Sequence, residues 1–506
     1  MKKISLIIII ITLFTKIFGL LRDIVLSYFY GASNISDAYL VSLTIPFVIF
    51  AFIGTSITTG FIPIFSRIES EESQFESDLF LSNIINIFLI ICSGLVIFGE
   101  IFASETVKIF AMGFSGRTLD LAVFFTRISL LSILFSVTVH IFSGYLQYRD
   151  RFISVSFIAM SANIVIIISI ILSKLTSYIF LPLGIVISYL IQLILMIPFI
   201  KKSGFKYKPK LTIKDKRIIE FVRNCIPVII GASANQINTL IDKTLASKIA
   251  EGAISSLNYS SRIKEMLIGV FVVTIATTMY PQLTRLINNN RIKEAKKLIE
   301  SSITTITFFI IPSTIGLILF PTPIINLLYG RGSFENSALI MTSNALFFYT
   351  FGLISFSYRE ILSRVFYSMG NTKIPMVNAF IAMTLNIVLN IVLSKYMGVS
   401  GLALATSIAA SISSLMLFVS LRRKIGPFGM KQISISFLKI LFASLVMGVL
   451  AKISFNYLTT SLSQNLSLLL TMGIGATSYL VIIYFMKIED VDVTVRAIKN
   501  KIRRGA

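Results

Sequence analysis

Tryptophan is absent from this 506-residue sequence, and it contains only one histidine and two cysteines. Cys92 and Cys225 lie in apolar runs, where a thiol behaves as a small hydrophobic group, so no disulfide or metal framework is expected. A single histidine, His140, excludes zinc chemistry and histidine-based acid–base catalysis as the main activity. It fits a packed core residue better than a proton carrier. No G-x-x-x-x-G-K-[ST] loop is present, so ATP is not expected to drive the protein.

Charged residues are also scarce, at 14% of the sequence, against about 25% in soluble domains. Hydrophobic residues make up 55%, and the mean hydropathy is +0.86. The formal charge of +23 is carried by short segments between apolar runs. This distribution favours membrane orientation over a nucleic-acid surface. We therefore expect a membrane protein with membrane lipids around it and no nucleic-acid partner.

Long apolar runs account for most of the chain. A spanning helix needs roughly 20 mostly apolar residues, and the sequence predicts an all-α polytopic membrane protein with fourteen transmembrane helices. The first is interpreted as a retained helix, because no small-residue cleavage site follows its apolar stretch. The predicted segments are 4–29, 37–66, 79–103, 119–147, 152–173, 177–200, 217–247, 253–284, 297–328, 336–368, 374–394, 399–421, 432–455 and 464–486.

Lysine and arginine gather in every second segment between these runs. The most basic segments are 201–217, 285–297, 422–431 and 487–504, whereas the intervening ones hold few cations. Basic residues favour the cytoplasmic side of a membrane. Both termini are therefore predicted to be cytoplasmic.

Two parts of the sequence resemble each other at an offset of about 222 residues, which indicates an internal repeat. The run beginning at Phe157 (FIAMSANIV) recurs from Phe380 (FIAMTLNIV). An offset of six helices keeps the copies in one orientation, as in transporters with parallel repeats. The predicted architecture is two six-helix lobes, residues 1–202 and 203–424. Residues 425–506 then form two further helices and a basic cytoplasmic tail.

Charged side chains occur inside the predicted helices, where each costs about 2.5–3.5 kcal/mol on insertion scales and usually faces a cavity or a partner. Cations outnumber anions, so a cavity of positive potential is expected. Lys16 and Arg262 lie well inside apolar runs. The set consists of Lys16, Arg22, Asp23, Arg127, Asp242, Lys243, Arg262, Lys264, Glu265, Arg359, Glu360 and Arg364.

Simpler interpretations exist for some of these residues. Arg22 lies in the outer half of the first helix and could extend its guanidinium to the interface. Glu360 and Arg364 are spaced i, i+4, which suits an intrahelical pair as well as a substrate role. Lys264 and Glu265 are adjacent and point in different directions, so they are weak candidates.

Neutral polar residues gather in the second half. Asn386 and Asn390 share one face of a predicted helix, and Asp242 and Thr406 lie on two others. Oxygen ligands around a single carboxylate can hold Na⁺. Hydrogen bonding between helices would use the same residues.

Several motifs match one family. They are Lys16-Ile-Phe-Gly-Leu-Leu-Arg-Asp23, Ser36-Asp-Ala-Tyr39, Tyr259-Ser-Ser-Arg262 and Phe366-Tyr-Ser-Met-Gly-Asn-Thr-Lys-Ile-Pro375. In these motifs, and over essentially its whole length, the sequence resembles the MurJ (MviN) family of lipid II flippases. That family belongs to the multidrug/oligosaccharidyl-lipid/polysaccharide exporter superfamily.

The resemblance implies a monomeric transporter of the inner membrane, not an enzyme. It would move lipid II to the outer leaflet by alternating access and so support cell-wall synthesis. A cationic cavity between the lobes would suit the pyrophosphate of lipid II, and the last two helices could line a groove for its tail. The resemblance also implies substrate-binding roles and a Na⁺ site, in which Asn390 stands where an acid is usual. The substrate-binding residues would be Lys16, Arg22, Asp23, Asp37, Arg262, Arg359 and Arg364, and the Na⁺ ligands Asp242, Asn386, Asn390 and Thr406.

Two rival classes can be compared with this expectation. A related exporter could move another lipid-linked oligosaccharide or a drug, but a drug exporter should have an acidic or aromatic cavity. A membrane-embedded glycosyl- or phosphotransferase would need carboxylates in polar loops, and the predicted outer loops are short.

Overall fold

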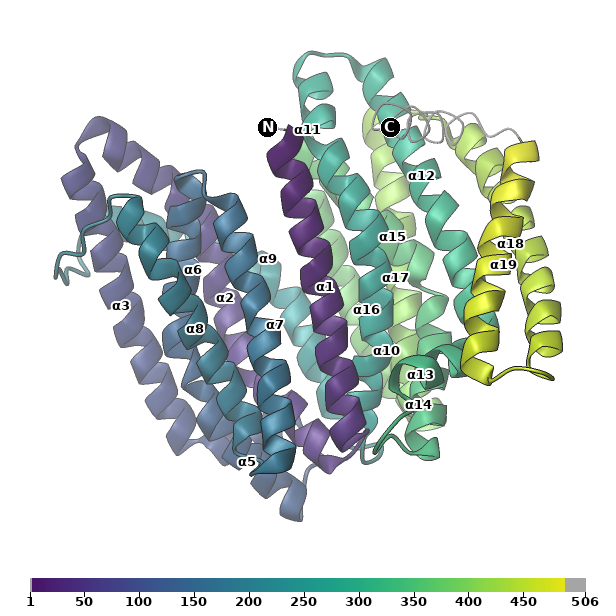
Figure 1. Ribbon diagram of the computed structural model, residues 1–506. Coiled ribbons are helices and arrows are strands. Elements are labelled where there is room, and N and C mark those ends of the chain that lie inside the picture. The colour runs from purple at the N-terminus through teal and green to yellow at the C-terminus, as the bar shows by residue number, and fades with distance from the viewer. Residues whose placement is uncertain (1, 487–506) are drawn as a thin grey trace. The chain divides into compact units, whose positions relative to one another are not determined.

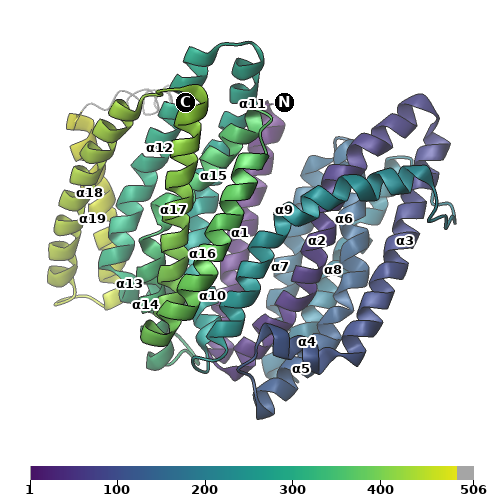
Figure 2. The same ribbon diagram turned by 180° about the vertical axis from the view of Figure 1, so that it is seen from behind.

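The computed structural model describes residues 2–486, except for the side chains of residues 2–6, 8–9, 49–59, 227–228, 230–232 and 234–235. Its chain forms two compact units. Unit 1 extends to Ser255 and also takes Gly332–Phe334, whereas unit 2 takes Ser256–Arg331 and the residues from Glu335 onward. Every regular element within the described range is a helix (Figures 1 and 2). The predicted basic tail, 487–506, lies outside the described residues.

Unit 1 is built from nine helices and the first turn of a tenth. Its core is formed mainly by packing of α2 against α5, α6 and α9, and of α7 against α1 and α8. The helices are α1 (Lys2–Tyr30), α2 (Asn34–Glu71), α3 (Gln74–Ile101), α4 (Ala103–Phe110), α5 (Gly116–Leu130), α6 (Ser132–Tyr148), α7 (Phe152–Leu175), α8 (Phe180–Lys202) and α9 (Lys216–Ala246).

Unit 2 contains the remaining helices, with α16 against α17 and α12 against α18 among its main packing pairs. A π-helical segment, η1 (Ile268–Val273), joins two of its α-helices without a break. The helices are α10 (Ala253–Leu267), α11 (Thr274–Asn288), α12 (Ile292–Leu319), α13 (Pro321–Tyr329), α14 (Asn336–Thr350), α15 (Leu353–Ser368), α16 (Lys373–Met397), α17 (Val399–Ile425), α18 (Met430–Leu458) and α19 (Gln464–Met486).

All fourteen predicted segments are helical, so the all-α prediction is confirmed. Some are interrupted: 119–147 becomes α5 and α6, bent by 40°, and 336–368 becomes α14 and α15, bent by 49°. The segment 297–328 divides where Phe320 separates α12 from α13. Within residues 2–486, nine helices are long and apolar enough to span a membrane, or up to eleven spans if each bent pair is one. The count of fourteen stays a prediction.

The boundary between the compact units differs from the predicted lobe boundary at 202. Helix α9, which the repeat assigns to the second lobe, belongs to unit 1 because it packs against α2, α3 and α4. The two divisions describe different properties, since one follows sequence repetition and the other follows packing.

Prolines interrupt the hydrogen bonding of several long helices, and at two of them a hydroxyl from another helix supplies the missing donor. Pro46 in α2 has no N–H for the carbonyl of Ser42, four residues earlier. The hydroxyl of Ser129 in α5 donates to that carbonyl at 2.7 Å. The lost intrahelical bond is thus replaced within unit 1.

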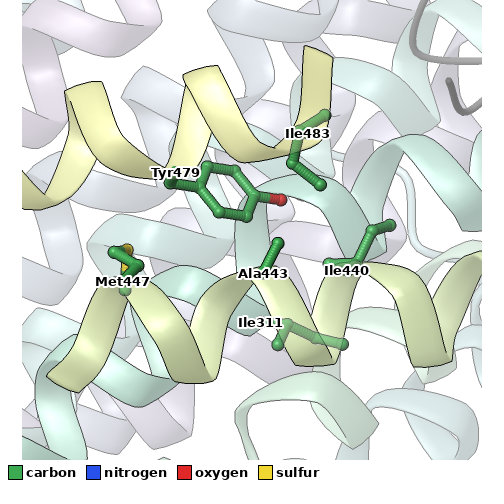
Figure 3. Close-up of a cluster of buried hydrophobic side chains, with 6 residues drawn as sticks. All are labelled: Ile311, Ile440, Ala443, Met447, Tyr479 and Ile483. Carbon is green, nitrogen blue, oxygen red and sulfur yellow. The ribbon is translucent and has the colours of Figure 1, made fainter. Parts of the chain in front are cut away.

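Pro312 in α12 creates the same vacancy at the carbonyl of Phe308. The hydroxyl of Tyr479 in α19 donates to this carbonyl at 2.7 Å. Figure 3 shows the Tyr479 ring lying across the α18–α19 pair, close to Ala443 and Ile483. One side chain therefore fills the core cluster and restores the backbone bonding of α12.

The bend between α14 and α15 is stabilised in a similar way. The Ser407 hydroxyl of α17 donates to the carbonyls of Phe348 and Tyr349, at 2.8 and 3.3 Å. Gly352 lies at the bend, where a Cβ atom would come within 2.8 Å of the Cα atom of Ser407. The glycine allows α17 to approach closely enough for this bond.

A segment without regular structure, residues 203–215, connects α8 to α9 and lies along α3 as the thin teal loop of Figures 1 and 2. Polar side chains of α3 hydrogen-bond its backbone. Asn83 both accepts from the N–H of Thr212 at 2.8 Å and donates to its carbonyl at 3.0 Å. Asn86 donates to the carbonyl of Lys210 at 2.9 Å. This contact fixes the segment to one helix.

Replacing Tyr479 by Phe should destabilise the protein, because the part-buried Phe308 carbonyl would lose its donor. We expect a loss of about 1–3 kcal/mol, measured as a lower melting temperature in detergent. Tyr484→Phe is the matched control, since this tyrosine is 71% exposed. In a Pro312→Ala background the tyrosine substitution should cost less, because residue 312 can then donate. Equal costs in both backgrounds would contradict the explanation.

Candidate functional site

The first predicted cluster lies on α1 in unit 1. Arg22 donates from Nε and Nη2 to one carboxylate oxygen of Asp23, at 3.0 and 2.9 Å. Asp23 is 1% exposed and Arg22 is 17% exposed. Arg22 is therefore held by its neighbour in the chain. Lys16 lies nearer the start of the same helix, is exposed, and forms no ion pair within the described residues.

Asp37 occupies the first turn of α2 and is 1% exposed. One of its oxygens accepts from the N–H of Gly252 at 2.9 Å, and the other from the N–H and hydroxyl of Ser255 at 2.8 and 2.6 Å. Gly252 has φ +76°, in the left-handed region that favours glycine. Asp37 thus caps the start of α10 with a charge suited to a helix N-terminus.

Asp242 and Lys243 are neighbours on α9, but the sequence predicted a binding role only for Asp242. Asp242 was predicted as a ligand, whereas Lys243 was only noted as charged. The ammonium of Lys243 donates to the carbonyl of Leu40 at 2.9 Å and also to the hydroxyl of Thr44, both on α2. Lys243 therefore joins two helices of unit 1.

Two of the predicted arginines of unit 2 pair with acids of their own helices. Arg262 on α10 donates to Glu265 at 3.1 Å, an i, i+3 pair. Arg364 on α15 donates to Glu360 from Nε and Nη2 at 3.1 and 2.9 Å. The intrahelical pair that the sequence allowed for Glu360 and Arg364 is thus present.

The other two cations of this group lie against aromatic rings. The Lys264 ammonium is 4.4 and 4.5 Å from the ring centroids of Tyr349 and Phe356. The Arg359 guanidinium is 5.7 Å from the same Phe356 ring. Phe356 thereby contacts cations from two helices, which keeps positive charge in a largely apolar setting.

Three of the four predicted Na⁺ ligands meet in unit 2. Asn390 donates to the amide oxygen of Asn386 at 3.0 Å, and Asn386 donates to the Thr406 hydroxyl at 3.3 Å. Both asparagines are buried. The fourth predicted ligand, Asp242, belongs to unit 1. The hydrogen bonding between helices that the sequence also allowed is present.

The structure thus groups the predicted residues within each unit. Arg22 and Asp23 are in contact in unit 1, and Arg262 belongs to unit 2. Sequence reasoning undervalued Glu265, which is the ion-pair partner of Arg262. The i, i+3 spacing of these residues was the available signal.

A bundle of long apolar helices that carry several cations is the arrangement of a multi-pass membrane protein. A solved MATE family transporter of the MOP superfamily has this fold, with a TM-score of 0.70 at 13% identity over 81% of this chain and 94% of its own.

The family model described as "Lipid II flippase MurJ" matches residues 26–473, so the chain belongs to that family. The lipid II flippase MurJ of Thermosipho africanus is 34% identical over 474 residues, 93% of each chain. A probable lipid II flippase MurJ of Buchnera aphidicola subsp. Baizongia pistaciae is 31% identical, covering 81% of each. A solved lipid II flippase MurJ in an inward closed conformation gives a TM-score of 0.83 at 32% identity, covering 95% of this chain and 98% of its own.

Replacing Asp37 by Ala should destabilise unit 1, because the N–H groups of Gly252 and Ser255 would lose a buried charged acceptor. A loss of about 1.5–3 kcal/mol is expected for charge-assisted bonds of this kind, visible in thermal unfolding. Asp120→Ala, which removes an exposed carboxylate, should leave the melting temperature unchanged. An unchanged melting temperature for the Asp37 variant would mean that capping is not its main role.

Proposed function

We propose that this protein transports lipid II from the cytoplasmic to the outer leaflet by alternating access, and so supplies precursor for cell-wall synthesis. The observation that carries the proposal is the family match over residues 26–473. The protein acts as a carrier in this proposal, and no covalent step is required of it.

The cations on α1, α10 and α15 provide the chemistry that a pyrophosphate-linked lipid needs. A guanidinium can donate paired hydrogen bonds to phosphate oxygens, and such bonds strengthen where water is excluded. Arg22 and Arg262 each have a carboxylate partner within three residues. We propose that phosphate replaces these carboxylates when lipid II binds, with Lys16, Arg359 and Arg364 adding positive potential.

Removing either arginine should abolish transport while leaving the fold intact. Arg22→Ala and Arg262→Ala should each fail to support growth as the only copy of the gene, and lipid II should accumulate on the inner leaflet. The loss of one charge-assisted contact corresponds to about 1.5–3 kcal/mol of binding. Arg262→Lys should restore activity partly, because the charge remains but the paired geometry does not.

Arg423→Ala is the matched control, since Arg423 is exposed at the end of α17, and it should grow normally. Membrane extraction and thermal unfolding would show whether each variant folds. If both folded alanine variants flip lipid II at the parental rate, arginine binding of pyrophosphate is ruled out. Accumulation of a different lipid-linked oligosaccharide on depletion of the protein would instead favour a related exporter.

We also propose that both termini and residues 201–217 lie on the cytoplasmic side, which follows from the distribution of basic residues. Single cysteines replacing Lys206 and Arg331, both exposed, provide the test. A membrane-impermeant thiol reagent should label position 331 in intact spheroplasts and position 206 only after lysis. Labelling of position 206 in intact spheroplasts would reverse the proposed orientation.

The polar residues of α16 and α17 suit a monovalent cation, since Asn386, Asn390 and Thr406 supply neutral oxygens of the type that hard cations prefer. We propose that they bind Na⁺, with Asp242 as the acidic ligand predicted from the sequence. Na⁺ should then raise the melting temperature of the purified protein. Asn386→Ala and Asp242→Asn should remove this effect, whereas Thr384→Ala, at an exposed position of α16, should retain it. Absence of any Na⁺ effect on the unmutated protein would leave these residues as helix-packing contacts.

A further inference from the structure

The region from the end of α8 to the start of α9, residues 201–216, forms a surface that lipid II transport does not explain; we call it the basic strap. It contains seven lysines and one acid, Asp215. Both of its ends continue into long helices of unit 1. Its two ends therefore lie at the ends of these helices.

The backbone of the basic strap is held by α3, and this leaves its side chains available. Asp78 and Ser82 accept from the N–H groups of Lys206 and Lys208, at 3.2 and 3.1 Å. Asn83 and Asn86 bond Thr212 and Lys210 further along. Asp78, Ser82 and Asn86 are spaced four positions apart and Asn83 follows Ser82, so the four residues lie on one side of α3.

Only part of the positive charge of the basic strap is neutralised within the protein. Lys210 lies 3.7 Å from Asp215, and the Lys208 ammonium lies 3.0 Å from the centroid of the Phe75 ring. Five further lysines are exposed and form no ion pair within the described residues. These are Lys201, Lys202, Lys206, Lys214 and Lys216.

Large apolar side chains are exposed among these lysines. Leu211 is 55% exposed and Ile213 is 68% exposed. The Tyr207 ring is 55% exposed while its hydroxyl donates to Asn86 at 2.9 Å. Exposed leucine and isoleucine beside lysine are typical of segments that lie in the membrane interface.

The position of the strap along α3 agrees with such a location. The strap contacts α3 from Gln74, which donates to the Gly204 carbonyl at 3.4 Å, to Asn86. That interval corresponds to about 18 Å of helix. Directly after Asn86, α3 continues with six apolar residues, 87–92. The contacts with Asn83 and Asn86 thus place residues 210–213, which include Leu211 and Ile213, beside the first part of the predicted span 79–103.

We propose that the basic strap binds anionic phospholipid headgroups of the leaflet at which α8 ends and α9 begins. The five exposed lysines attract phosphate groups, and Leu211 and Ile213 enter the boundary with the acyl chains. Each lysine close to an anionic surface contributes to such attraction, and salt screens it. This inference does not depend on which lipid the protein transports.

A fluorescent label at Ile213→Cys, with Cys92 and Cys225 replaced by alanine, tests the proposal in the full-length protein. The labelled protein is reconstituted into vesicles of phosphatidylcholine, alone or mixed with phosphatidylglycerol. Acrylamide quenching should fall about two-fold or more when phosphatidylglycerol is present. High NaCl should reverse the change. Replacing the five exposed lysines by glutamine should remove it.

A label at Leu462→Cys is the matched control, because Leu462 is 37% exposed in a turn, 459–463, without charged residues. Its quenching should be equal in both vesicles. Equal quenching at position 213 in both vesicles, or no effect of NaCl, would overturn the proposal and indicate a strap that faces water or another protein. If the glutamine variant does not fold, the NaCl dependence of the parental lysines decides the question.

Discussion

Hydrocarbon offers no hydrogen bonds, so each backbone carbonyl released within a membrane-spanning helix needs a donor from the protein. Three hydroxyl groups meet this constraint in the structure. Ser129 compensates for Pro46, Tyr479 compensates for Pro312, and Ser407 bonds the carbonyls at the bend between α14 and α15. Each of these irregularities is thus stabilised by a hydrogen bond between two helices.

The charged residues follow a different pattern, which bears on transport. Arg22, Arg262 and Arg364 pair with acids one, three and four residues away on the same helix. Such local pairs are weak, on the order of 0.2–0.5 kcal/mol for the i, i+3 and i, i+4 spacings in isolated helices. Phosphate can therefore compete with Glu265 and Glu360 at little cost, whereas displacing the buried Asp23 from Arg22 requires the stronger charge-assisted bonds of a pyrophosphate. Asp37 contrasts with them, because three donors from a distant segment hold it.

Hydropathy was sufficient to locate all fourteen helical segments, because burial in lipid imposes length and apolarity on each helix. Hydropathy could not predict that α12 ends at Leu319, because the residues on both sides of this end are equally apolar. The i, i+4 spacing predicts the ion pair Glu360–Arg364, and the i, i+3 spacing of Arg262 and Glu265 could have predicted theirs. The contacts of Asp37 and Lys243 could not be predicted from spacing, because they join residues about 200 positions apart. Packing of α9 in unit 1 is likewise a tertiary property that the internal repeat conceals.

The way α3 holds residues 203–215 has a consequence for divergence between related proteins. Asn83 and Asn86 hydrogen-bond backbone groups of Lys210 and Thr212. These bonds do not depend on the side chains of Lys210 or Thr212. Substitutions in 203–215 can therefore accumulate without loss of its path, whereas changes at Asn83 or Asn86 cannot. In organisms with different membrane lipids, a few substitutions could thus change the charge of this segment while the rest of the transporter stays the same.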